Sequence, residues 1–337
     1  MCQVLHWGRK IIMHARKKIF FKNKLWLIAF LMLIIVISVG LIMLKMGEYF
    51  LKKDLISRDT SIICAQREYL EEDTSYITRL YKYNLEGQET LLEEQYEFFD
   101  MVSSKDNNKL LSFIGHKEHF NIVEYDIKRQ ELRYILSTEQ IEAFLDENGY
   151  KKSLAQREGS CVKYYDNENG ISFLYDNYIM GYSEKKGLEM IYAIQGTAGN
   201  VYCWMEDDTS LLINEGTELI KYNTLTGEKT TLLTQPYTFS FVLSTDESFV
   251  VFEDREKGYL WIYNLKSGER KKLCKRYHPF PELQISEDNR YLLCKDSVQV
   301  LSSSKKVVYI VDIESGKKAK VKEWGFDTDI SAVAWNR

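Results

Sequence analysis

Four stretches of this chain repeat one alternation of apolar and polar residues around a glycine-containing turn. The clearest copies are Tyr259–Leu273 and Glu218–Leu232, and looser copies are Ile77–Leu91 and Val307–Val321. Alternation on both sides of a short polar turn is the pattern of a β-hairpin. A hairpin that recurs about every 40 to 50 residues predicts an all-β array of repeated units.

The spacing of these hairpins predicts how many units the array contains. The apolar residue before each turn marks the register, and these residues are Leu85, Ile127, Leu225, Leu265 and Ile313. The interval between the second and third marks is about twice the others, so one degenerate unit is expected at Ile171–Ile191. Six units of four strands have the size of β-propeller blades. A seven-bladed ring is the alternative, if 128–200 holds two short units.

A second element recurs upstream of the hairpins. Phe239–Phe252, Leu283–Cys294 and Phe99–Phe113 each join two strand-like runs through a polar turn rich in Asp, Asn and Ser. Asp and Asn favour such turns because their side chains bond nearby backbone groups and tolerate left-handed conformations. Each unit therefore has two hairpin-like halves.

Together these two elements resemble the blades of TolB-like and dipeptidyl-peptidase-type (WD40-like) β-propeller repeats. The motif residues are Ser244 and Asp246 with Tyr263–Glu269, and Ser286 and Asp288 with Val311–Gly316. The resemblance covers about 61–337 and implies a propeller fold; it carries over no catalytic residue. The expected structural signature of the repeat comprises Asn84, Gly87, Asn223, Gly227, Asp246, Tyr263, Asn264, Gly268, Asp288, Asp312 and Gly316.

The two ends of the repeat region predict how the ring closes. Ile330–Trp335 reads as the first strand of a blade, and Ser61–Gln66 reads as a second strand without a first. Pairing these segments would complete one blade and remove two free strand edges.

One segment, 137–153, departs from the strand pattern. Ser137 and Gln140 have the spacing of a capping box, and Ile141 and Leu145 fall on one helical face. We expect a short helical insertion on one rim of the ring. Rim insertions serve either recognition or spacing, and both roles stay open.

The N-terminal region predicts a membrane anchor. The twenty residues 25–44 carry no charge, which is long enough to cross a hydrocarbon core as a helix. Seven basic residues lie in 1–24, so by the positive-inside rule this tail is cytoplasmic, 45–60 forms a stalk and 61–337 lies outside. This is the topology of a single-pass type II protein of the cell membrane. The alternative is a cleaved signal peptide, whose apolar core is normally shorter.

Charge is distributed unevenly. Residues 1–53 carry about +9, and the remainder carries about −13. An acidic main domain repels phosphate backbones, so we expect no nucleic-acid partner. The sequence has no N-x-[ST] sequon, which fits a bacterial exterior.

Candidate chemistry is sparse. The chain has five histidines, six cysteines without a C-x-x-C pair, and no G-x-S-x-G or H-E-x-x-H motif. We therefore predict no catalytic residue, metal site or cofactor. The favoured function is a non-catalytic binding or scaffold module for an envelope protein, peptide or glycan. The alternatives are a glycan- or ester-processing enzyme that uses carboxylates in a central funnel, and a transmembrane ligand sensor.

Overall fold

The computed structural model divides the chain into two compact units, Met1–Phe50 and Leu51–Arg337. The predicted basic tail, 1–24, lies outside the described residues. The structure describes residues 30–56, 58, 60–69, 76–116, 119–150, 159–165, 169–195, 202–205, 207–234, 240–254, 258–275, 282–300, 303–325 and 328–336.

A continuous N-terminal helix runs from Phe30 to Ile56 and has a mean hydropathy of 2.5 over its most apolar window. The side chains of 30–46 are exposed. By length and composition this helix is able to cross a membrane, and a signal sequence would have the same properties. The predicted stalk, 45–60, begins as the continuation of this helix.

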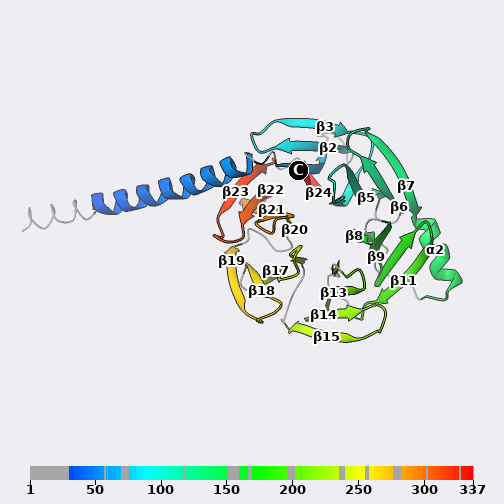
Figure 1. The fold of residues 1–337 in the computed structure, drawn as a ribbon. Helices are drawn as coiled ribbons and strands as arrows, with labels where there is room; N and C mark the ends of the chain where they lie inside the picture. The colour runs from blue at the N-terminus through cyan, green and yellow to red at the C-terminus, as the bar shows by residue number, and fades with distance from the viewer. Residues whose placement is uncertain are drawn as a thin grey trace, which may run out of the picture. The chain divides into compact units, whose positions relative to one another are not determined.

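The second unit is a six-bladed β-propeller, as the sequence predicted (Figure 1). The seven-bladed alternative is wrong, because 159–193 forms a single four-stranded sheet. The strands of the first three blades, from the inside outward, are β24 (Thr328–Asn336), β1 (Ser61–Tyr69), β2 (Tyr76–Asn84) and β3 (Glu89–Glu93); β4 (Phe98–Ser103), β5 (Lys109–His116), β6 (His119–Asp126) and β7 (Glu131–Ser137); and β8 (Gly159–Tyr165), β9 (Gly170–Tyr175), β10 (Tyr178–Ser183) and β11 (Gly187–Ala193).

The other three blades have the same antiparallel order. Their strands are β12 (Tyr202–Trp204), β13 (Ser210–Glu215), β14 (Glu218–Asn223) and β15 (Lys229–Thr234); β16 (Phe241–Leu243), β17 (Phe249–Asp254), β18 (Tyr259–Asn264) and β19 (Arg270–Lys275); and β20 (Glu282–Ile285), β21 (Tyr291–Val300), β22 (Ser303–Asp312) and β23 (Lys318–Glu323). We number the blades 1 to 6 in this sequence.

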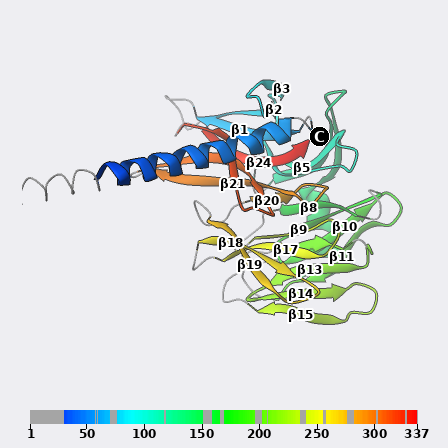
Figure 2. The same ribbon diagram turned by 60° about the vertical axis from the view of Figure 1, so that its left-hand side comes forward.

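Blade 1 closes the ring with strands from the two ends of the propeller. β24 pairs antiparallel with β1 in the register Ile62↔Trp335, so the expected pairing of these segments is present. Figure 2 shows β24 beside β1 from a second direction. The ring thus has no unpaired first strand in blade 1.

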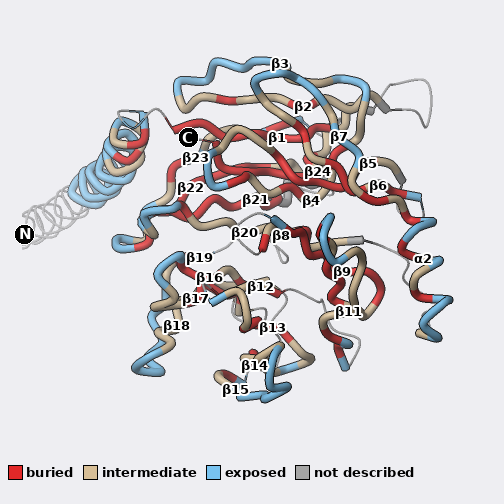
Figure 3. Tube along the Cα trace, turned by 45° about the vertical axis from the view of Figure 1, so that its right-hand side comes forward, coloured by how far each residue is buried: buried red, intermediate tan, exposed pale blue. Residues whose placement is uncertain are grey.

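The second strand of each blade is the most buried, and the outer strands carry most of the exposed residues. β9 is buried along its whole length, whereas β3 begins with three exposed residues. Figure 3 shows this gradient from red inner and middle strands to pale outer strands. It follows from packing blade faces against each other around a centre, which leaves only the outermost strand in water.

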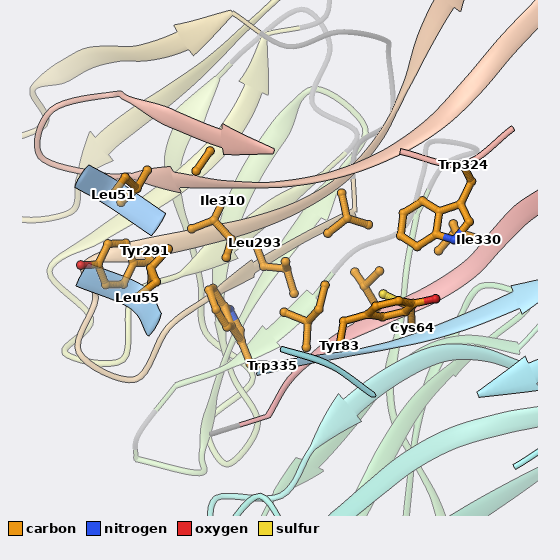
Figure 4. Close-up of a cluster of buried hydrophobic side chains, with 14 residues drawn as sticks. Leu51, Leu55, Cys64, Tyr83, Tyr291, Leu293, Ile310, Trp324, Ile330 and Trp335 are labelled. Carbon is orange, nitrogen blue, oxygen red and sulfur yellow. The ribbon is translucent and has the colours of Figure 1, made fainter. Parts of the chain in front are cut away.

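The end of the N-terminal helix that belongs to the second unit packs into the core between blades 6 and 1. Leu55 is fully buried and Leu51 is 6% exposed, in a cluster with Tyr291 and Trp335. Figure 4 shows Leu51, Leu55 and Tyr291 together at one end of this cluster. The start of the predicted stalk is therefore part of the propeller core.

The rim segment holds a helix, α2 (Thr138–Glu147), with the capping box between Ser137 and Gln140. Ile141 and Leu145 are fully buried against blades 2 and 3. Thr138 Oγ1 accepts from the backbone amide of Phe120 at 2.9 Å, which fixes the first turn to β6. α2 is an integral part of the packing and not a detachable appendage.

Candidate functional site

The predicted signature residues at the outer hairpins lie in the turns between the third and fourth strands. The side-chain oxygen of Asn264 accepts from the amides of Lys266 at 2.9 Å and Ser267 at 2.8 Å. Asn223 and Asp312 make equivalent bonds, and so does Asn84 with the amides of Glu86 and Gln88. The glycines of these turns have positive φ values, namely Gly87 (92°), Gly227 (75°), Gly268 (72°) and Gly316 (68°).

The two signature aspartates lie in the turns between the first and second strands. Asp246 accepts from the amide of Ser248 at 3.2 Å and from its hydroxyl at 2.8 Å. Asp288 accepts from the amide of Arg290 at 3.2 Å. Burial opposes ionisation of Asp246, but these hydrogen bonds outweigh it and lower the pKa of its carboxyl. These acids shape the turns.

Tyr263 has a different part, since it joins neighbouring blades. Its hydroxyl donates to the carbonyl of Leu232 in blade 4 at 2.8 Å. Tyr125, at the same position of blade 2, donates to the carbonyl of Leu92 in blade 1 at 2.8 Å. We call this tyrosine-to-carbonyl bond the seam bond.

The carbonyl that accepts a seam bond belongs to a β-bulge in the outermost strand. In every blade the register between the third and fourth strands shifts by one residue, which leaves one residue out of the ladder. The bulged residues are Leu92, Ile135, Ile191, Leu232, Leu273 and Val321.

The seam between blades 2 and 3 lacks the seam bond and holds a groove. Tyr182 has the donor position, but its hydroxyl bonds to none of the described residues, including its expected partner Ile135. A groove of about 590 Å³ lies there, lined by both residues and by Arg133, Tyr134 and Tyr164. This is within the volume range of small-ligand sites.

Charged residues surround this groove. Arg133 reaches Glu124 of its own blade at 3.3 Å and Glu184 of blade 3 at 3.2 Å, so it bridges the seam. Glu124 is also paired with Lys109 at 3.0 Å. Tyr164 donates to Glu124 at 3.4 Å, and this fixes its ring on the groove wall.

Other open seams are filled by neighbouring side chains. Between blades 3 and 4 the rings of Tyr192 and Tyr222 lie 4.6 Å apart, centroid to centroid. Between blades 6 and 1, Tyr83 meets Trp324 edge-on at 5.9 Å. The seam between blades 2 and 3 therefore differs in having a lined groove where these seams have stacked rings.

A second polar cluster lies on the innermost strands. Asp100 of β4 has a positive φ of 52° and accepts from the amide of Val162 at 3.1 Å. Burial, with a smaller contribution from Glu282, raises the pKa of Asp100. Glu282 is paired with Lys295 at 2.5 Å. Burial lowers the pKa of Lys163, but Asp100 and the nearby thiols and acids outweigh it, so the net shift is upward.

Gln284 ties this inner cluster together across blades. Its side-chain amide donates to the carbonyl of Met101 at 2.9 Å and to that of Val333 at 2.7 Å. The described thiols do not add a nucleophile, since burial raises the pKa of Cys161 to about 12 and keeps it protonated. No three His, Cys, Asp or Glu side chains in the described ranges converge on a common metal position.

Comparisons with known proteins agree with the geometry of the ring. No family model matches the chain, and no curated protein does. Among solved structures, TolB from Acinetobacter baumannii matches with a TM-score of 0.63 at 11% identity, over 82% of this chain and 66% of that chain. The fold is that of the TolB propellers. This chain spans slightly less than two thirds of that protein's length.

Two further solved structures match over nearly their whole length. A putative TolB from Agrobacterium tumefaciens has a TM-score of 0.53 at 9% identity, over 82% of this chain and 99% of that chain. A putative 6-phosphogluconolactonase from Bacteroides fragilis has a TM-score of 0.52 at 12% identity, over 83% and 98%. At these identities the likeness concerns the fold alone.

Sequence reasoning did not find the groove. The tyrosine before each turn residue is visible in the sequence at Tyr83, Tyr125, Tyr182, Tyr222 and Tyr263. Which of them forms a seam bond depends on the neighbouring blade, and a single repeat does not contain that information.

Proposed function

We propose that this chain is a non-catalytic, membrane-anchored binding module that presents the propeller outside the cell. The N-terminal helix has the length and hydropathy of an anchor, and the basic residues before it favour a cytoplasmic N-terminus. The observation that carries the proposal is the packing of the helix end into the propeller core. A ring fixed in this way to the residues that follow the anchor is a rigid platform for a partner.

Polar contacts reinforce this attachment. Asp54 pairs with Arg290 at 3.2 Å, and Arg58 pairs with Asp288 at 2.7 Å. Tyr291 donates to Asp54, and the Arg290 guanidinium lies 5.0 Å from the centroid of the Tyr291 ring. Exposed ion pairs add little individually, but here they surround a buried apolar contact and fix its orientation.

An enzyme that uses inner-wall carboxylates is the second candidate. The observation in its favour is Asp100, whose raised pKa and nearby Glu282 are features of general acids. An Asp100→Asn variant that abolished turnover of any substrate while leaving its binding intact would favour this reading.

The anchor is tested by fractionating cells that make the full chain. Membrane retention of a protein with an intact N-terminus, resistant to alkaline extraction, is expected. A soluble product that begins shortly after residue 44 would show a cleaved signal peptide. External protease should degrade the propeller of intact spheroplasts; protection of the propeller would contradict the topology.

The binding role is tested by crosslinking in intact membranes, followed by purification and mass spectrometry. Deleting the rim segment would expose the pockets of Ile141 and Leu145, so point changes on the exposed face of α2 are the better probe. Glu139→Lys with Glu147→Lys reverses two exposed charges without touching the core. Loss of a specific crosslink in this variant would place the partner on that rim, and recovery of no partner in any variant would contradict the proposal.

A further inference from the structure

The groove between blades 2 and 3 has a donor that the repeat normally uses for a seam bond. Tyr125 and Tyr263 donate to bulge carbonyls at 2.8 Å, whereas the Tyr182 hydroxyl has no partner among the described residues. Its intended acceptor, Ile135, lies on the opposite wall. A bound group that both accepts and donates hydrogen bonds would complete the seam, and an alcohol hydroxyl does both.

Aromatic rings from both blades line the space. Tyr134 and Tyr164 come from blades 2 and 3, and the Tyr134 side chain is 57% exposed. Rigid tyrosine faces provide contact area with little loss of side-chain entropy. They suit the flat C–H face of a sugar ring, whose hydroxyls point outward to polar groups such as Asn169 and Ser183.

The charges indicate which sugars would bind. Three cations, Arg133, Lys185 and Lys186, and two carboxylates, Glu124 and Glu184, line the groove. Arg133 already neutralises the two carboxylates. Lys185 and Lys186 form no ion pair with described residues, so the groove retains positive charge on a chain whose propeller region is acidic.

We propose that the groove between blades 2 and 3 binds an acidic oligosaccharide. The sugar rings pack on Tyr134 and Tyr164, a hydroxyl bridges Tyr182 and the Ile135 carbonyl, and carboxylates meet Lys185 and Lys186. This inference rests on the proposed function, because it assigns one ligand class to the binding module. An acidic peptide would satisfy the lysines but would not use the alternating hydroxyls that the open seam favours.

The test is calorimetric titration of the full chain in nanodiscs of neutral phospholipid. The probes are a glucuronic acid tetrasaccharide, the neutral cellotetraose and hexaglutamate. Saturable binding of the acidic tetrasaccharide is expected, with cellotetraose weaker by about tenfold. Lys185→Glu with Lys186→Glu should weaken the acidic probe at least about tenfold, and Tyr134→Ala about fivefold or more.

Lys266→Glu is the matched control, because Lys266 lies in the corresponding turn of blade 5, away from the groove. It should change affinity by less than about twofold. Binding that is absent, or that survives both groove variants, overturns the inference. Tighter binding of hexaglutamate overturns the ligand class.

Failure of the inference and of the proposed function are separable. Membrane crosslinks that persist in the lysine variants, with no saccharide binding, refute the groove site and leave the binding module standing. Cleavage of the tetrasaccharide during the titration would instead contradict a non-catalytic function.

Discussion

The seam bond of blade 2 is the interaction whose removal tests the packing argument most directly. Tyr125 is fully buried, and its hydroxyl donates to the Leu92 carbonyl at 2.8 Å, while its ring meets Phe98 edge-on at 5.8 Å. Tyr125→Phe deletes the hydroxyl and keeps the ring. Because the carbonyl then loses its partner in a partly buried place, the free energy of unfolding should fall by about 1–2 kcal/mol.

The matched control is Tyr182→Phe, at the same repeat position but without a seam bond. For a domain of this size, about 1 kcal/mol corresponds to a Tm change of about 2–4 °C. We expect Tyr125→Phe to lower Tm by about 2–6 °C and the urea midpoint in proportion, with an unchanged m-value. Tyr182→Phe should change Tm by less than about 1 °C.

Scanning calorimetry and urea titration of both variants measure these effects. An equal loss of stability in the two variants would show that the hydroxyl acts through something other than the seam bond. No loss in Tyr125→Phe would refute the idea that this bond stabilises the blade contact.

Three further changes have distinct expected outcomes. Leu55→Ala should lower the urea-derived free energy of unfolding by about 2–5 kcal/mol by leaving a cavity, whereas Ile56→Ala, 37% exposed, should cost less than about 1 kcal/mol. Gly316→Ala should be more destabilising in the same assay than Gly227→Ala; both have positive φ, but only at Gly316 would the new Cβ come within 2.5 Å of a backbone carbonyl. For Asp100, the raised pKa means that its contribution to stability is present at low pH and lost as pH rises through the folded-state pKa. Asp100→Asn should therefore gain stability relative to the wild type between pH 4 and pH 7 in thermal melts, and a pH-independent difference would contradict this.

Much of the fold was predictable because it is local. The alternation at Tyr259–Leu273 specifies a hairpin on its own, and Asn264 specifies the turn through bonds to the next two or three amides. The degenerate blade around Ile171 was found from spacing, since a ring of repeats leaves no room for an arbitrary gap. Ring closure followed from two incomplete blades at the ends of the repeat region.

The groove was not predictable because it depends on what does not pair. Tyr182 looks like Tyr125 in the sequence, and Ile135 occupies a bulge like every other blade. Whether their two side walls meet is decided by the packing of whole sheets, which includes α2 wedged at the same blade pair. The prediction of a central funnel site likewise rested on the fold type and not on particular residues.

Blade 1 has a consequence for the order of events during synthesis. Ser61 of β1 bonds to Asn336 of β24, 275 positions later, so the first strands made wait longest for their partner. Until then β1 has an open edge able to pair with the wrong strand, and the pocket for Leu55 lacks Trp335. The nascent chain should therefore depend on chaperones throughout its production, and release from them should coincide with the arrival of its final strand.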